Sequence, residues 1–153
     1  MKLTLKQIFE ASPALARLGS EKLPVKMAYT IGRNIQKLKP ELENFDKIRD
    51  DLIKNKYGVK NDEGNFEISA KNREKFVDEI NVLQALEVEV DIWVVKLSEL
   101  EALQEAKSGK DKDKEIVTSL EMAVLDFMFE YDLKGSPNGH KPGTGTPKRK
   151  RSK

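Results

Sequence analysis

The chain has 153 residues, of which 38% are hydrophobic and 35% are charged, and its formal net charge is +2. It contains no cysteine, which excludes disulfides, thiolate catalysis and cysteine-based zinc sites. Its only histidine, His140, lies in a tail rich in glycine and proline, where nothing would hold an imidazole in place for catalysis or metal binding.

The charge is divided unevenly between a body and a tail. Lys134–Lys153 contains seven basic and no acidic residues, which leaves 21 basic and 26 acidic residues in Met1–Leu133. About 133 residues is the usual size of one domain, so we expect a single globular domain at 1–133 followed by a disordered basic tail at 134–153. No apolar run reaches the roughly 18 residues that span a bilayer, so no membrane association is expected.

The N-terminal residues predict a first helix. Thr4 and Gln7 fit a capping box, in which each side chain satisfies a free backbone N–H of the other residue. Apolar residues then follow at helical spacing to about Gly19. Because an interior proline removes one backbone hydrogen bond, Pro13 predicts a bent or broken helix.

A second and longer helical region follows. Pro24 stands at a favourable first helical position, and apolar residues recur at steps of three and four from Ala28 to Leu52. This seam passes through Pro40, where an interior proline costs about 3 kcal/mol. The sequence therefore leaves two alternatives, a single helix kinked at Pro40 or two helices that form a hairpin. The seam from Ile31 to Leu52 is also a candidate surface for binding another protein.

Short strands are predicted in the middle of the chain. Asn61–Gly64 has the composition of a tight turn between two short strands, Val59–Lys60 and Asn65–Ile68. After a helix that begins near Ala70, residues 86–94 alternate apolar and polar side chains, as in a strand with one buried face. A lone strand cannot satisfy its backbone, so we expect it to join the hairpin in one antiparallel sheet of about three strands.

The sequence contains no strong sign of a catalytic or metal site. Glu87, Glu89 and Asp91 lie on one face of the predicted strand, a geometry that suits a hard cation such as magnesium. A solvent-facing strand surface normally carries such residues, however, and magnesium sites usually recruit ligands from more than one element. Neither a glycine-rich phosphate loop nor a dinucleotide fingerprint is present. We therefore expect no enzyme activity, no cofactor and no metal.

The C-terminal part of the body predicts a short helix at Ser98–Ala106 and a final helix at about Glu115–Tyr131. Within the final helix one broad stripe is predicted to face the core, namely Leu120, Ala123, Val124, Phe127, Met128 and Tyr131. Met122, Leu125 and Phe129 form a second apolar stripe on the opposite side. Two alternatives follow: the helix is sandwiched inside the domain, or the second stripe binds a partner protein or a second copy.

The tail ends in a cluster of positive charge that could neutralise several phosphates. Its basic residues are Lys148, Arg149, Lys150, Arg151 and Lys153. The tail has no aromatic side chain on which a base could stack, so selective recognition of single strands is not expected. We predict nonspecific binding to nucleic acid or to an acidic protein surface. The same residues also fit a nuclear import signal, which is a short pattern with a high false-positive rate.

Two groups of short motifs carry a resemblance to a known family. They are Glu21–Tyr29, Asn34–Ile35 and Pro40–Glu43 in the first half, and Leu86–Ile92, Lys96–Glu101 and Leu120–Met128 in the second. At these residues the chain resembles a family of small uncharacterised bacteriophage proteins, over about residues 3–131. The resemblance implies a protein made in the cytoplasm of an infected bacterium, and located there or in the virion. That setting argues against nuclear import.

Taken together, the elements predict an α+β fold that is predominantly helical, with a long or kinked N-terminal helical region, a small antiparallel sheet and a C-terminal helix. The predicted function is that of a non-enzymatic bacteriophage accessory protein, which acts through protein–protein interaction in virion assembly or in interference with a host system. The alternative is a nucleic-acid-associated phage protein that is tethered by its basic tail.

Deleting Gly143–Lys153 is expected to abolish nonspecific binding to nucleic acid. Binding by basic residues releases counterions, so the affinity of the full-length chain should fall by orders of magnitude between low and moderate salt. Fluorescence anisotropy with a labelled oligonucleotide measures both effects. Salt-insensitive binding, or binding that survives the deletion, would contradict the role of the tail.

Overall fold

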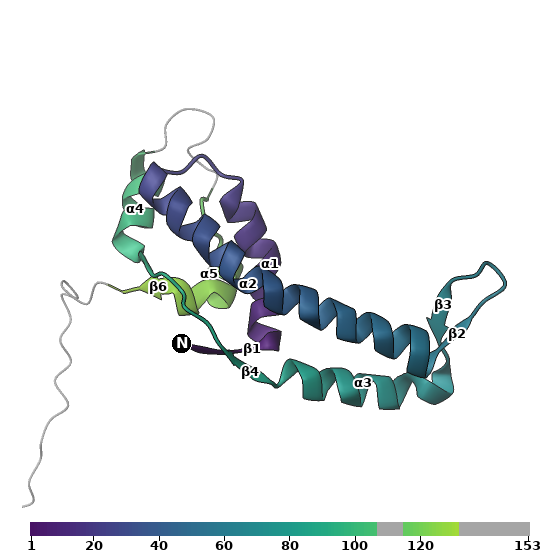
Figure 1. Cartoon of the computed structure of the whole chain (residues 1–153). Helices are drawn as coiled ribbons and strands as arrows, with labels where there is room; N and C mark the ends of the chain where they lie inside the picture. The colour runs from purple at the N-terminus through teal and green to yellow at the C-terminus, as the bar shows by residue number, and fades with distance from the viewer. Residues whose placement is uncertain (107–114, 132–153) are drawn as a thin grey trace, which may run out of the picture.

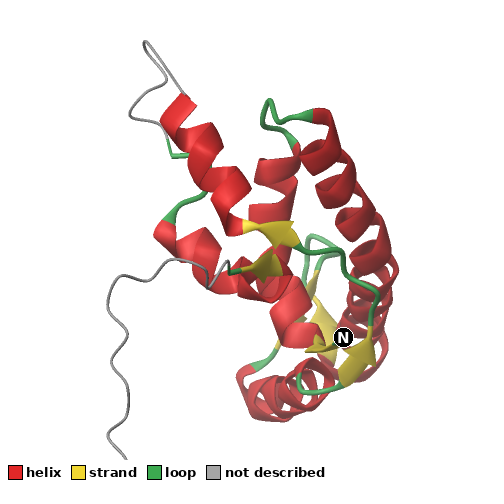
Figure 2. Ribbon diagram, turned by 90° about the vertical axis from the view of Figure 1, so that its left-hand side faces the viewer, coloured by secondary structure: helices red, strands yellow, loops and turns green. Residues whose placement is uncertain are grey.

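The structure, a computed structural model, describes residues 1–106 and 115–131 of the chain. Helices form most of it and the strands are short (Figure 2), so the predicted α+β, predominantly helical fold is confirmed. The linker at 107–114 and the predicted tail at 134–153 lie outside the described residues. None of the described helices is both long and apolar enough to cross a membrane.

The described parts of the chain contain five α-helices and six strands. The helices are α1 (Leu5–Gly19), α2 (Val25–Asp51), α3 (Ala70–Gln84), α4 (Leu97–Ala106) and α5 (Ser119–Leu125). A π-helical segment, η1 (Leu52–Tyr57), extends α2, and a 3-10 turn, η3 (Asp126–Met128), follows α5. The strands are β1 (Lys2–Thr4), β2 (Gly58–Lys60), β3 (Phe66–Ile68), β4 (Glu87–Glu89), β5 (Val95–Lys96) and β6 (Phe129–Glu130).

Both N-terminal helices continue through an internal proline. The predicted capping box is confirmed, since the Gln7 N–H donates to the Thr4 hydroxyl at 3.2 Å and the Thr4 N–H donates to the Gln7 side chain at 2.9 Å. Pro13 lies inside α1 and Pro40 inside α2, so of the two alternatives at Pro40 the structure contains the single helix. Both prolines are exposed, which lets water solvate the carbonyl groups that lose a helical partner.

The second half of α2 extends away from the rest of the molecule, and we call residues 46–82 the arm (Figure 1). At its far end η1 leads into the β2–β3 hairpin, and α3 runs back towards the body. Tyr57 joins the two sides, because its hydroxyl donates to Glu79 at 2.7 Å. Gly58 follows η1 closely: a Cβ there would lie 2.1 Å from the Ile53 carbonyl oxygen, so this close approach requires glycine.

The strands pair differently from the single sheet that the sequence predicts. β4 pairs antiparallel with β1, with Val88 opposite Leu3, whereas β2 and β3 pair only with each other and β5 and β6 form a parallel pair. The prediction that the strand at 86–94 joins the hairpin is therefore wrong. The reason is that α3 spans about 22 Å between them and leaves the hairpin at the far end of the arm. β1 is too short for its alternation to be read from the sequence.

The core forms around α1, whose apolar side is buried against α2 and α5. The rings of Phe9 in α1 and Phe45 in α2 have their centres 5.4 Å apart. The large apolar side chains that are fully buried are Ile8, Leu18, Ile31, Leu38, Leu125 and Met128. Because these residues come from both ends of the described chain, α1 determines where α2 and the C-terminal elements lie.

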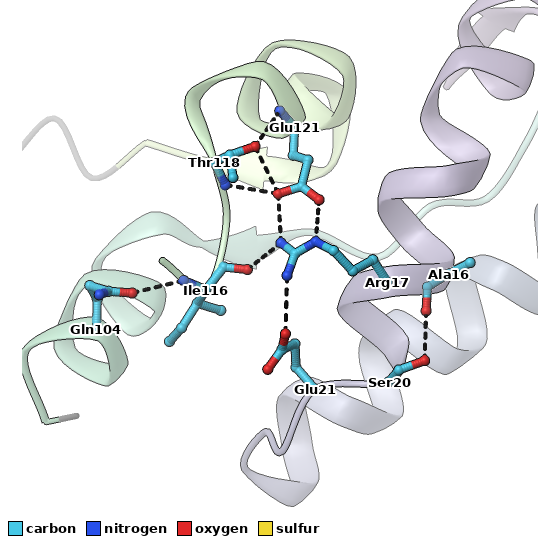
Figure 3. Close-up of polar contacts among 8 residues, drawn as sticks. All are labelled: Ala16, Arg17, Ser20, Glu21, Gln104, Ile116, Thr118 and Glu121. Carbon is cyan, nitrogen blue, oxygen red and sulfur yellow. Dashed lines mark hydrogen bonds and ion pairs between the residues drawn. The ribbon is translucent and has the colours of Figure 1, made fainter. Parts of the chain in front are cut away.

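Arg17 of α1 joins three segments through one guanidinium group (Figure 3). Its Nε and Nη2 donate to the two carboxylate oxygens of Glu121, Nη2 also donates to the Ile116 carbonyl oxygen at 2.6 Å, and Nη1 donates to Glu21 at 3.0 Å. Glu121 also forms a capping box with Thr118 at the start of α5. The hydrogen bonds from Arg17, and next those from Thr118, lower the pKa of the Glu121 carboxyl from 4.5 to about 2. The ion pair therefore fixes α5 to α1 beside the core.

Replacing Glu121 with glutamine is expected to destabilise the protein at neutral pH by about 1–2 kcal/mol, because Arg17 loses its charged partner. The folded-state pKa is depressed, so this contribution is present above about pH 4.5 and is lost as the pH falls towards 2. Urea denaturation of both proteins should therefore show a difference in unfolding free energy that shrinks over this interval.

The matched control for this prediction is Glu10→Gln. Glu10 pairs with Lys6 at 3.8 Å on an exposed side of α1, and such a pair is worth at most about 0.5 kcal/mol. Equal destabilisation by the two substitutions, or a difference for Glu121→Gln that does not change with pH, would contradict the assigned role of the Arg17–Glu121 pair.

Candidate interaction surface

The structure packs side chains from both stripes predicted for the C-terminal helix against the core, including Met128, Val124 and Phe127 of the predicted core-facing stripe. Leu125 is 0% exposed and Phe129 is 6% exposed, and the half-buried Met122 packs against the same core. Leu120, which was predicted to face the core, is 77% exposed. Met122, Leu125 and Phe129 therefore follow the alternative in which they pack inside the domain, so a partner surface has to be sought elsewhere, whereas the core-facing prediction is wrong for Leu120.

The length of the helix explains this error. Projecting residues 115–131 at about 100° per residue assumes one continuous helix. The actual helix, α5, contains only seven residues and is followed by η3 and β6, which turn the chain to a different direction. The helix begins at Ser119 rather than at about Glu115, and the capping box of Thr118 and Glu121, which the sequence analysis did not use, marks this start.

The other candidate sites from the sequence have different outcomes. In the seam from Ile31 to Leu52, Ile31, Leu38 and Phe45 are buried in the core, whereas its end at Leu52 lines a surface groove together with the exposed Ile48. The basic residues predicted to bind nucleic acid, Lys148, Arg149, Lys150, Arg151 and Lys153, lie outside the described residues. Within 1–106 and 115–131, no three acidic, cysteine or histidine side chains are placed to hold a metal ion, and this includes the row from Glu87 to Asp91.

Tyr29, Arg33 and Trp93 form a cluster on the surface of α2. The rings of Tyr29 and Trp93 meet edge to face with their centres 5.8 Å apart, and the Arg33 guanidinium carbon lies over the Trp93 ring at 5.4 Å from its centre. Tyr29 is 58% exposed and Trp93 is 41% exposed. Tyrosine, tryptophan and arginine are the residues that most often dominate the binding energy of protein interfaces, so this cluster is a candidate interaction site.

Asn34 holds Trp93 in this position from beneath. It is fully buried, its Nδ2 donates to the Trp93 carbonyl oxygen at 2.8 Å, and its Oδ1 accepts from the Trp93 N–H at 2.9 Å. A neighbouring strand would supply the same two bonds, but β4 ends at Glu89. The Asn34 side chain therefore replaces a strand partner and fixes the main chain at Trp93 against α2.

An uncharged stripe of α2 lies next to the cluster, beside the exposed Lys26. Val25, Ala28, Tyr29 and Gly32 recur at steps of three and four, so they lie on one side of the helix, where Val25 is 87% exposed. A Cβ at Gly32 would meet no described atom within 4 Å, although glycine inside a helix costs about 1 kcal/mol relative to alanine. This glycine leaves room for another chain to approach α2 closely. The aromatic face, as we call this surface, consists of Val25, Ala28, Tyr29, Gly32, Arg33, Trp93 and Val94.

A second apolar region lies at the base of the arm. It is a shallow groove of about 370 Å³ between the end of α2 and α3, with Asp78 and Glu79 among its lining residues. Its apolar lining consists of Ile48, Leu52, Val82, Leu83 and Leu86. These residues include no aromatic ring and no arginine, which are the side chains that anchor most interfaces. The aromatic face is therefore the stronger candidate.

Sequence analysis missed the aromatic face, although one signal for it exists. Val25, Ala28, Tyr29 and Gly32 form an uncharged stripe on α2, whereas a solvent-facing helix stripe normally carries charged residues. The contact with Trp93 has no such signal. Asn34 and Trp93 are 59 residues apart, and only the fold brings them together.

Replacing Asn34 with alanine is expected to destabilise the protein by about 2–3 kcal/mol, because the N–H and C=O of Trp93 lose the two partners that the buried amide supplies. Trp93 is the only tryptophan of the chain, so its fluorescence reports both the unfolding transition and the local change. We expect its emission to shift to longer wavelength as the segment leaves α2. Gln36→Ala, at an exposed position of the same helix, is the control. Wild-type stability and emission in Asn34→Ala would refute the role of the clamp.

Comparison with known proteins gives no further assignment. No protein-family model, no curated protein and no solved structure matches the chain. The resemblance to small bacteriophage proteins therefore stays a prediction, and a functional proposal has to rest on the chemistry of the surface itself.

Proposed function

We propose that this protein is a non-enzymatic interaction module that binds another protein through its aromatic face. The observation that carries the proposal is the cluster of Tyr29, Arg33 and Trp93, which is exposed and yet held in a defined geometry. The resemblance to phage proteins suggests the setting. In that setting the module would act as a bacteriophage accessory protein, in virion assembly or in interference with a host system.

The rigidity of the face supports this proposal. Tyr29 and Arg33 lie on a long helix, and the main chain at Trp93 is held by the two hydrogen bonds from Asn34. Side chains that are ordered before binding lose less conformational entropy when a partner arrives. Val25 lies one helical turn before Tyr29 and is exposed, so the rings and this aliphatic side chain form a surface with apolar anchors and a polar edge.

The ionisable groups with shifted pKa values support a non-enzymatic role. Glu121, whose pKa is lowered, bonds Arg17 and fixes α5 to α1. Glu79, whose pKa is lowered by hydrogen bonds from Lys56 and Tyr57, joins α3 to η1. Each of these shifts therefore follows from an ion pair that holds two elements together, which is the structural explanation for a perturbed pKa rather than the catalytic one.

A second candidate function is tethering to nucleic acid. Its support is the charge of the sequence, which places five basic residues within the last six positions. This function would use a different part of the chain from the aromatic face. The two activities are therefore compatible, and each can be tested without affecting the other.

Val25→Glu is expected to remove the protein partner. A carboxylate on the exposed side of α2 would be buried without a partner in the complex, so capture should fall at least about tenfold. The test compares wild-type and variant chains as baits in a nuclease-treated lysate of the bacterium in which the protein is made, with quantitative mass spectrometry as the readout. Circular dichroism checks that the variant is folded.

The matched control for this experiment is Val82→Glu, at an exposed valine in the arm. It introduces the same charge on a helix, at the groove that we rank second. If the wild type and Val25→Glu capture equal amounts of the partner protein, the aromatic face is not the binding site. This conclusion holds whether or not Val82→Glu loses the partner.

A further inference from the structure

We infer that the partner of the aromatic face is an acidic protein segment, which places a carboxylate on Arg33 while its apolar side chains cover Val25 and Tyr29. The inference rests on the proposed function, since it specifies the chemistry of the partner that the face binds. It follows from three observations on the described residues: the charge of α2, the state of the Arg33 side chain, and the exposed aliphatic groups around it.

The first half of α2 and the residues just before it are positively charged. Between Glu21 and Glu41 the chain has no acidic residue, and it has five basic residues, Lys22, Lys26, Arg33, Lys37 and Lys39. The second half of the helix is acidic, so this positive region is local. A positively charged surface attracts an acidic partner and disfavours a basic one, which gives the face its selectivity.

Nearby carboxylates compensate only part of this charge. Lys26 pairs with Glu99 at 3.3 Å, Lys37 with Asp91 at 4.0 Å and Lys39 with Glu43 at 3.6 Å, and five of these six side chains are more than two-fifths exposed. Exposed pairs of this kind are weak and can be rearranged when a partner binds. Arg33, at the centre of the face, pairs with no carboxylate of the described residues.

The Arg33 side chain is held by Trp93 and lacks an anion. Its Nε is shielded from water and has no hydrogen-bond partner, while the guanidinium lies over the Trp93 ring. Elsewhere in the same chain, the guanidinium of Arg17 donates hydrogen bonds to the carboxylate of Glu121. A guanidinium stacked on an aromatic ring leaves its edge free for a carboxylate, and such charged hydrogen bonds are the strong ones.

The aliphatic part of the face favours a protein over a nucleic acid. Arg33 already lies over the Trp93 ring, where a base would otherwise stack, and exposed Val25 offers a nucleotide strand neither charge nor a stacking surface, whereas it suits an apolar side chain of a polypeptide. The open space at Gly32 permits the close approach of a backbone. A symmetric dimer through this face is also disfavoured, because it would place the positive first half of α2 against itself.

The test uses the full-length chain as bait and the partner that depends on Val25. Carbodiimide, a zero-length reagent, joins a lysine amine to a carboxylate that is already in contact with it. We expect cross-links from Lys22, Lys26, Lys37 or Lys39 to aspartate or glutamate of the partner. We also expect Arg33→Gln to weaken capture about tenfold or more.

The matched control is Arg49→Gln, on the same helix but paired with Asp46 at 2.8 Å. Its capture of the partner should equal that of the wild type. Cross-links confined to other lysines, or equal capture by Arg33→Gln and Arg49→Gln, would overturn the acidic-partner inference and leave the proposed function intact. Three other results would instead overturn binding to another protein. They are the absence of any protein whose capture depends on Val25, the recovery of nuclease-sensitive material alone, and self-association in analytical ultracentrifugation that Val25→Glu abolishes.

Discussion

The pair of hydrogen bonds between Asn34 and the main chain of Trp93 is the constraint on which the functional surface depends. An amide side chain carries a donor and an acceptor on two separate atoms, so it can bond both the C=O and the N–H of one residue, as a neighbouring strand does. By placing such a group at a fully buried position of α2, the chain carries the extended segment after β4 across the helix without a sheet. The direction of β5 and α4, and the position of the aromatic face, follow from this contact.

The core and the proposed recognition surface lie on different sides of the molecule. α1 supplies the centre of the core, and its Arg17 adds a charged connection to α5. The aromatic face lies on the outward side of α2, where its side chains contribute little to that core. Sequence changes that alter the binding partner can therefore occur at Val25 or Tyr29 with little effect on the free energy of unfolding, which is the usual condition for a surface that diversifies.

The sequence predicts the parts of this fold that depend on local interactions. The capping box at Thr4 and the periodicity of α2 act within a few residues, and both are confirmed. The pairing of β4 with β1 and the contact of Asn34 with Trp93 join residues far apart in the chain, so no local pattern contains them. The C-terminal helix lies between these cases: Thr118 and Glu121 mark its start, but its end at Leu125 depends on the burial of Leu125, Met128 and Phe129 in the core.

The arm has a consequence for how the molecule opens. Across residues 46–82, all of which the structure describes, Tyr57 is the only buried residue, so the arm has little apolar contact to hold it closed. Segments of this kind open by local unfolding while the rest of a domain stays folded, and their amide protons exchange early. The turn at Asn61–Gly64 lies at the end farthest from the aromatic face. It is therefore the position at which the chain should best accept an inserted sequence, such as a fluorescent label or a second domain, without disturbing the recognition surface.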